Sequence, residues 1–187
     1  QTLYILSEDN DDTGTLEVQG LDADYNLLTE TITLTGTTAV ATSNTFLRVY
    51  RMVYTDDGAG NLGDITARVT SETGTVVAHI EAGFSQTLMC VYTVPAGKTA
   101  YMMVEDFSVQ KNKDAQVLML QRAFGTNNFR IAHMAEVYET TYRYDFPIPL
   151  PIPEKTDLDI RVDNVETNNT RVTCNFTMVL VNNELDC

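Results

Sequence analysis

Residues 93–101 read TVPAGKTAY, and residues 152–160 read IPEKTDLDI. In each stretch a β-branched residue and a proline lead into a Lys-Thr pair, and an alternating apolar pattern follows. Proline interrupts a strand because it lacks an amide donor, and the alternation is the period of a half-buried strand. The repeat therefore predicts the same kind of strand entry at two places in a β-protein.

Period-two alternation extends along nearly the whole chain, whereas helical periodicity is almost absent. In the first part of the chain, turn-forming connections rich in Gly, Asp and Asn separate the strand patterns. We expect an antiparallel β-module of about five or six strands over residues 1–83. Its clearest strand patterns lie at residues 15–18, 29–36, 46–54, 64–69 and 75–80.

In residues 84–187 the strand patterns recur about every ten residues, with turn signals between them. This spacing predicts an antiparallel β-sandwich or jelly roll. The patterns lie at residues 86–94, 100–110, 115–124, 129–138, 141–146, 157–165 and 171–181. Good helix formers at 115–124 and 130–139 leave one short helix open, although neither segment has a convincing cap or helical stripe.

Residues 146–153 read FPIPLPIP and are called the strap below. A proline at every second position keeps the backbone extended and removes alternate amide donors, so the strap fits only the edge of a sheet. Its apolar residues are Phe146, Ile148, Leu150 and Ile152. Two readings stay open: a rigid crossover packed on its own domain, or an exposed segment that grips a neighbouring subunit.

The charge balance restricts the partners. Twelve Lys and Arg residues face 26 Asp and Glu residues, which gives a net charge of −14. Such a surface repels phosphate backbones and suits a basic partner, so direct nucleic-acid binding is not expected. No apolar run approaches the roughly 20 residues of a membrane span, so no membrane contact is expected either.

Residues that carry chemistry are few. His79 and His133 lie in strand patterns without an accompanying nucleophile motif, so each is expected to be structural. Residues 22–26 have part of the spacing of a calcium loop, but Leu27 replaces its glycine. Cys90 and Cys174 sit in strand patterns as small hydrophobes, and Cys187 ends the chain. We expect no catalytic, metal or cofactor site.

Three segments of the chain resemble segments of a known protein family. They read GLDADYNLLTETITLTGTTAVATSNTFLRVYRMVY (20–54), AGNLGDITARV (59–69) and QTLMCVYTVPAGKTAYM (86–102). Together they resemble a family of virion structural proteins from tailed bacteriophages, especially marine ones. The resemblance is continuous from residue 15 to 103, weakens over 104–145 and returns at PIPEKTDLDIRV. It implies a component of the virus particle.

Three functions follow as expectations. The first is a capsid decoration (cement) protein on the capsid exterior, which would form a homotrimer and bind the major capsid protein. The second is a tail or head-fibre module that recognises a host glycan or protein through the Tyr and Asn residues of 138–146 and 165–170. The third is a carbohydrate-active enzyme on a jelly roll, for which the sequence pairs no two carboxylates.

For the decoration protein, three contact regions are expected. The acidic loop Ser7–Asp12 would face a basic patch of the capsid, and the strap would pack against a neighbour. Arg48, Arg51 and Arg68 would form inter-strand or inter-subunit salt bridges. The acidic side chains of the loop are Glu8, Asp9, Asp11 and Asp12. Serine at positions 148, 150 and 152 together should block assembly and leave the monomer folded.

Overall fold

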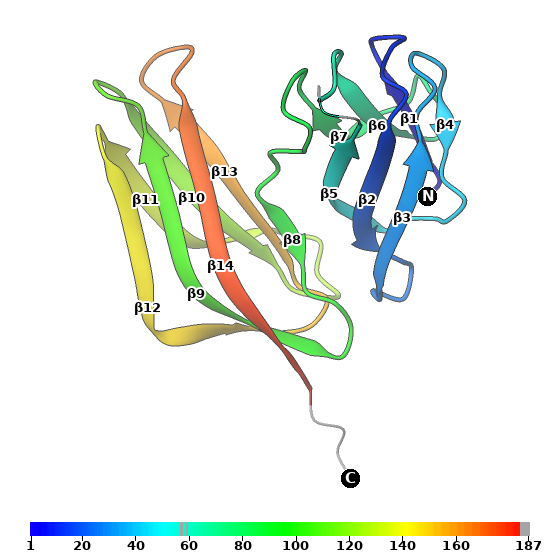
Figure 1. Cartoon of the computed structure of the whole chain (residues 1–187). Coiled ribbons are helices and arrows are strands. Elements are labelled where there is room, and N and C mark those ends of the chain that lie inside the picture. Colours follow the sequence, from blue (N-terminus) through cyan, green and yellow to red (C-terminus); the bar gives the residue numbers. More distant parts are fainter. Residues whose placement is uncertain (57, 59, 184–187) are drawn as a thin grey trace. The chain divides into compact units, whose positions relative to one another are not determined.

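The computed structural model describes residues 1–56, 58 and 60–183 (Figure 1). The chain divides into two compact units, Gln1–Met89 and Cys90–Cys187, a few residues beyond the boundary expected at 83/84. Every regular element among the described residues is a β-strand, and every pairing is antiparallel. The all-β fold is therefore confirmed, and the segments that left a helix open are strands.

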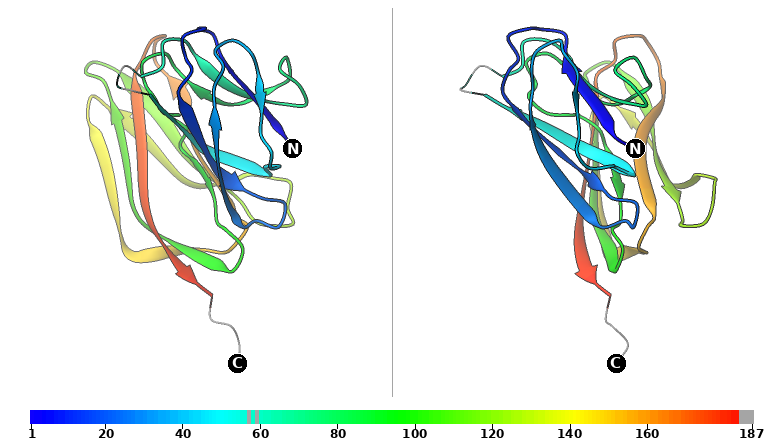
Figure 2. Two further views of the ribbon diagram at one scale, coloured as in Figure 1. Left: turned by 45° about the vertical axis from the view of Figure 1, so that its right-hand side comes forward. Right: turned by 90° about the vertical axis from the view of Figure 1, so that its right-hand side faces the viewer.

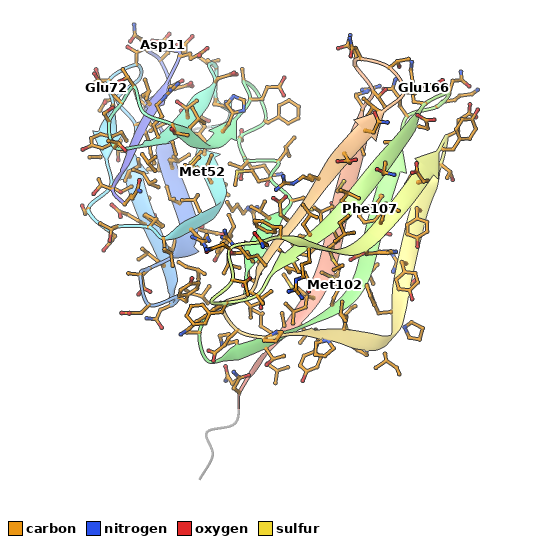
Figure 3. All side chains as sticks on the ribbon, turned by 180° about the vertical axis from the view of Figure 1, so that it is seen from behind. Asp11, Met52, Glu72, Met102, Phe107 and Glu166 are labelled. Carbon is orange, nitrogen blue, oxygen red and sulfur yellow. The ribbon has the colours of Figure 1, made fainter. Side chains whose placement is uncertain are left out.

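Unit 1 consists of a four-stranded sheet of order β4-β1-β6-β7 and a three-stranded sheet of order β3-β2-β5. Its strands are β1 (Leu3–Ser7), β2 (Thr15–Leu21), β3 (Leu27–Thr33), β4 (Val40–Ala41), β5 (Arg48–Thr55), β6 (Ile65–Val69) and β7 (Val76–Ile80). Side chains from both sheets form one core, in which Met52 lies fully buried (Figure 3). Two of these strands, β1 and β4, were not expected from the sequence.

Unit 2 is an antiparallel sandwich of two sheets, with orders β11-β10-β13-β8 and β12-β9-β14. Its strands are β8 (Val91–Thr93), β9 (Lys98–Val109), β10 (Asp114–Arg122), β11 (Arg130–Tyr138), β12 (Thr141–Ile152), β13 (Asp157–Val165) and β14 (Val172–Asn182). Met102 and Phe107 of β9 point between the sheets and are buried in their common core (Figure 3). Alternate residues of each strand fill this core, as the period-two pattern requires.

The two similar motifs at residues 93–101 and 152–160 hydrogen-bond to each other. The Val94 amide donates to the Thr156 carbonyl at 3.0 Å, and the Lys155 amide donates to the Val94 carbonyl at 2.7 Å. The Gly97 amide also donates to the Glu154 carboxylate at 2.6 Å. We call this contact the turn clasp. It joins the entry of β9 to the entry of β13, which lie in opposite sheets.

The two turns of the clasp have the same backbone form. In each, the second residue after the proline is left-handed, with φ of 70° at Gly97 and 60° at Lys155. Glycine adopts this conformation without strain, whereas a residue with a Cβ does not. The resemblance between the two sequence motifs is therefore a resemblance in structure.

The strap forms the second half of β12, at the edge of its sheet, as the prolines predict. Asp145 pairs with Val104 and Leu150 pairs with Met102, so four residues of β12 oppose the single residue Met103. At this bulge β12 turns a sharp corner, visible in yellow in Figure 1 and in the left view of Figure 2. The prolines thus both occupy the edge and bend it.

The first prediction concerns the left-handed position in the turn clasp. Gly97→Ala should lower the free energy of unfolding by about 1–2 kcal/mol, because alanine at positive φ is strained. No atom lies within 4 Å of the added Cβ, so strain is the sole cost. Gly97→Asn is the matched control, since asparagine tolerates this conformation better. Equal losses for both variants in urea denaturation would contradict the explanation.

Candidate functional site

For one residue of the acidic loop Ser7–Asp12, the expected contact with a partner is wrong. Asp12 was expected to face a basic partner, but it is only 1% exposed. Its carboxylate accepts hydrogen bonds from the amides of Leu62 and Gly63, at 2.8 and 3.0 Å, and from the Ser7 hydroxyl at 2.5 Å. Asp12 therefore connects two loops of unit 1 and is not available to a partner.

The rest of the acidic loop lies at the surface. Glu8 and Asp11 are exposed, and Asp9 is half-buried and accepts a hydrogen bond from the Asp11 amide at 2.9 Å. Asp11 projects from the tip of the loop (Figure 3). These three carboxylates remain candidates for contact with a basic surface.

Arg51 and Arg68 of unit 1 donate hydrogen bonds to neutral acceptors. Arg51 donates to the side-chain oxygen of Gln86 at 3.0 Å, and Arg68 donates to the Thr66 hydroxyl and the Gly74 carbonyl. Arg48 donates to the carbonyl of the preceding residue. Hydrogen bonds thus hold Arg51 and Arg68 where inter-strand salt bridges were expected, and the inter-subunit alternative stays a prediction.

Of the four apolar side chains that alternate with the prolines of the strap, one faces solvent and the other three turn toward the core of unit 2. Ile152 is buried, and Phe146 and Leu150 are half-buried against the core of unit 2. Ile148, at the corner, is 82% exposed. Serine at position 152 would open the core, so the triple serine variant would not leave the monomer intact, contrary to the expectation. Only Ile148 suits a contact with a neighbour.

A buried ionisable pair closes one side of the sandwich in unit 2. Glu105 of β9 is fully buried, and its Oε2 lies 2.5 Å from Nδ1 of His133 on β11. The rings of Tyr142 and Tyr144 flank the imidazole, with centroids 6.0 and 5.3 Å away. This arrangement places His133 in a structural contact between the two sheets, in line with the structural role expected for it.

His79 has a different environment. Its Nε2 lies 3.0 Å from the Asp64 carboxylate at the surface of unit 1. The hydrogen bond from His79, followed by that from the Ala82 amide, lowers the pKa of Asp64 below its usual value. Both partners are substantially exposed, so the pair is worth little to stability.

The remaining candidate groups have structural partners. Asp22 accepts hydrogen bonds from the amides of Asp24 and Asn26, so its loop is an Asx turn of a hairpin. Burial raises the pKa of the Cys90 thiol to about 12 and also raises that of Cys174; both are free cysteines. Cys187 lies outside the described residues.

The described residues contain no cluster of three or more His, Cys, Asp or Glu side chains placed to hold a metal ion. Nor does any helix with the length and hydrophobicity of a membrane span occur among them.

An apolar surface on the outer face of the β11-β10-β13-β8 sheet was not expected from the sequence. Ile131 pairs with Leu120, and Met134 pairs with Leu118; cross-strand partners share a face. The alternate residues Val117 and Met119 point into the core, so these four point outward. Ile131 is 59% exposed and Met134 is 52% exposed.

Two arginines extend this surface across the sheet. Arg122 lies over the Phe129 ring at 4.8 Å, and Arg161 approaches the same ring at 5.9 Å. Asp157 and Asp159 form ion pairs with Arg122 and Arg161, respectively. We call the set the outer-face patch: Arg122, Phe129, Ile131, Met134 and Arg161. Aromatic, methionine and arginine side chains are the types enriched in protein interfaces.

A pocket of about 520 Å³ lies at one end of β10 and β11. Phe124 and Ile131 contribute apolar walls, and Asn128, Arg130 and Glu154 contribute polar groups. Gln121 also lines it, and the buried side-chain nitrogen of Gln121 has no hydrogen-bond partner. The pocket therefore combines an aromatic ring with amide, guanidinium and carboxylate groups.

Comparison of the chain with protein-family models, with curated proteins and with solved structures gives no match. The class that the structure defines is an all-β protein of two antiparallel units.

The second prediction compares the two histidines. His133→Ala leaves the Glu105 carboxylate buried without its partner and should lower the free energy of unfolding by about 3–5 kcal/mol. The control, His79→Ala, breaks an exposed pair and should change the free energy of unfolding far less. Urea denaturation of both variants measures the difference. Similar small losses would show that His133 has no structural role.

Proposed function

We propose that the chain is a structural protein of a tailed-bacteriophage virion, and that it decorates the capsid by binding the major capsid protein. The observation that carries the binding mode is the outer-face patch, in which exposed Ile131 and Met134 adjoin two arginines stacked on Phe129. Exposed apolar side chains grouped on one rigid face are typical of surfaces that bind other proteins. The resemblance of residues 15–103 to virion proteins supports the assignment to a particle.

Two further features agree with this role. Four of the five patch residues lie on strands, and Phe129 directly precedes β11. A sheet holds such residues more rigidly than loops do, so little ordering entropy is lost on binding. The net charge of −14 and the exposed carboxylates of Glu8 and Asp11 suit a capsid surface with basic groups. Many weak contacts of this kind, made by many copies, support firm attachment.

The third prediction tests the contact surface. Purified chain should sediment with capsids that lack it, and Met134→Glu should weaken binding about tenfold or more, because a charge replaces an apolar contact. Leu27→Glu is the matched control, since Leu27 of unit 1 is exposed to a similar degree, 54%. Equal binding by both variants would remove the outer-face patch from the interface. No binding by the unaltered chain would refute decoration.

The pocket at the end of β10 and β11 favours a second candidate function, recognition of a host glycan. Sugars stack on aromatic rings and hydrogen-bond to amides and carboxylates, and Phe124, Asn128 and Glu154 offer these groups. The sequence had assigned this role to residues 138–146 and 165–170, which contribute nothing to the pocket lining. Binding of host-derived oligosaccharides, lost in Asn128→Ala, would support this function.

A further inference from the structure

Strand β14 is an unprotected sheet edge. It is the last strand of its sheet, and among the described residues it pairs only with β9. Its eleven residues, VTCNFTMVLVN, include no proline and no charged residue. Edge strands usually carry such protection, because their free amides and carbonyls attract other strands. The opposite edge of the same sheet, β12, has prolines and a corner.

The regularity of β14 also favours pairing. The register shift between β14 and β9 falls where Thr177 pairs with Val104 and Met178 pairs with Met102. The extra residue, Met103, therefore belongs to β9, and β14 itself continues without a bulge. A continuous extended strand can pair along its full length.

The side chains of β14 are incompletely covered on both faces. On the inward face, the alternate residues from Val172 to Leu180 pack against the core, yet all five remain only half-buried. On the outward face, Val179 and Val181 are about half exposed. A neighbouring strand would cover apolar surface on both faces, which is favourable.

We propose that β14 pairs antiparallel with β14 of a second copy, about a twofold axis at Thr177. This register uses all eleven residues, because Val172 then lies opposite Asn182 of the second copy. On the inward face, Phe176 opposes Met178 and Cys174 opposes Leu180. A slip by one residue would place inward side chains against outward ones. A slip by two would keep the faces but leave Val172 and Thr173 without partners in the second β14, so the register that pairs the full strand is favoured.

The lack of charged residues on β14 favours a second copy of the chain as the occupant. Each copy carries −14, so two copies repel each other over most of their surface. The uncharged β14 is a place where they meet without placing like charges in contact. A basic foreign strand would gain no ion pair there. A second β14 necessarily matches the first in length and side-chain character. The contact is then isologous, with the same surface used on both copies.

The test is a crosslink made with purified full-length chain in a Cys187→Ser background. In the proposed register Thr177 lies opposite Thr177 of the second copy. Their Cα atoms would be about 5 Å apart, a separation that a disulfide can bridge. Thr177→Cys should therefore crosslink under mild oxidation into a dimer. Thr173→Cys is the matched control on the same exposed face. The cysteines at position 173 of the two copies would lie about 27 Å apart, so this variant should not crosslink.

Sedimentation equilibrium of the unaltered chain supplies an independent readout. A dimer is expected, and Thr177→Lys should raise its dissociation constant about tenfold because two ammonium groups then face each other. Thr173→Lys should change it less. A monomer at high concentration, or the trimer expected from the sequence, would overturn the proposal, as would equal crosslinking at both positions. The pairing does not depend on the proposed function, since neither experiment involves capsids.

Discussion

The hydrogen bonds between the two Pro-containing turns hold one end of unit 2 together. Val94, Thr156 and Lys155 exchange backbone hydrogen bonds there, and Gly97 donates to Glu154. Because β9 and β13 belong to opposite sheets, this contact ties both layers of the sandwich at the point where their strands begin. The buried Thr93–Asp157 hydrogen bond, at 2.6 Å, reinforces the same place. The pairing of β8 with β13 continues directly from it.

Each small antiparallel sheet has two edge strands with unpaired backbone groups. Whether such an edge is protected decides whether another strand can pair with it. Prolines and a corner protect β12, and the Glu105–His133 pair with its flanking tyrosines closes the adjoining side of the sandwich. On the other side β14 has no second partner strand within the described part of the chain, while the outer-face patch lies on the facing sheet. Unit 2 thus combines the outer-face patch, which we propose binds the capsid, with the β14 edge, which we propose pairs with a second copy.

The strands were predictable to the extent that each has its own alternating pattern. Each of the seven strands of unit 2 overlaps a segment that the alternation marked, because a half-buried strand has a period of two in its sequence. The largest difference is at β12, which was expected to end at residue 146 and continues to Ile152 through the strap. In unit 1, β4 has only two residues, too few to show a period, and β1 is a short apolar run beside an acidic stretch. Such runs are weak evidence for a strand.

The candidate site was less predictable, because it depends on contacts between distant residues. Asp12 is buried by amides 50 and 51 residues further along the chain, which no local pattern reveals. Ile148 and Ile152 share the same parity, yet the corner between them exposes one and buries the other. The apolar surface beside the outer-face patch was not recognised in VLML (117–120), because apolar residues on both faces of β10 remove the alternation there. The available signal is a strand with apolar residues at successive positions, because one of its two apolar faces must then lie outside the core.

The central claim is that this chain works as a structural part of a virus particle, and its copy number there tests it most directly. Quantitative mass spectrometry of purified virions, scaled to the major capsid protein, gives that number. A copy number comparable to that of the major capsid protein is the predicted result. A few copies per particle would indicate a tail or vertex module, and absence from the particle would contradict the account.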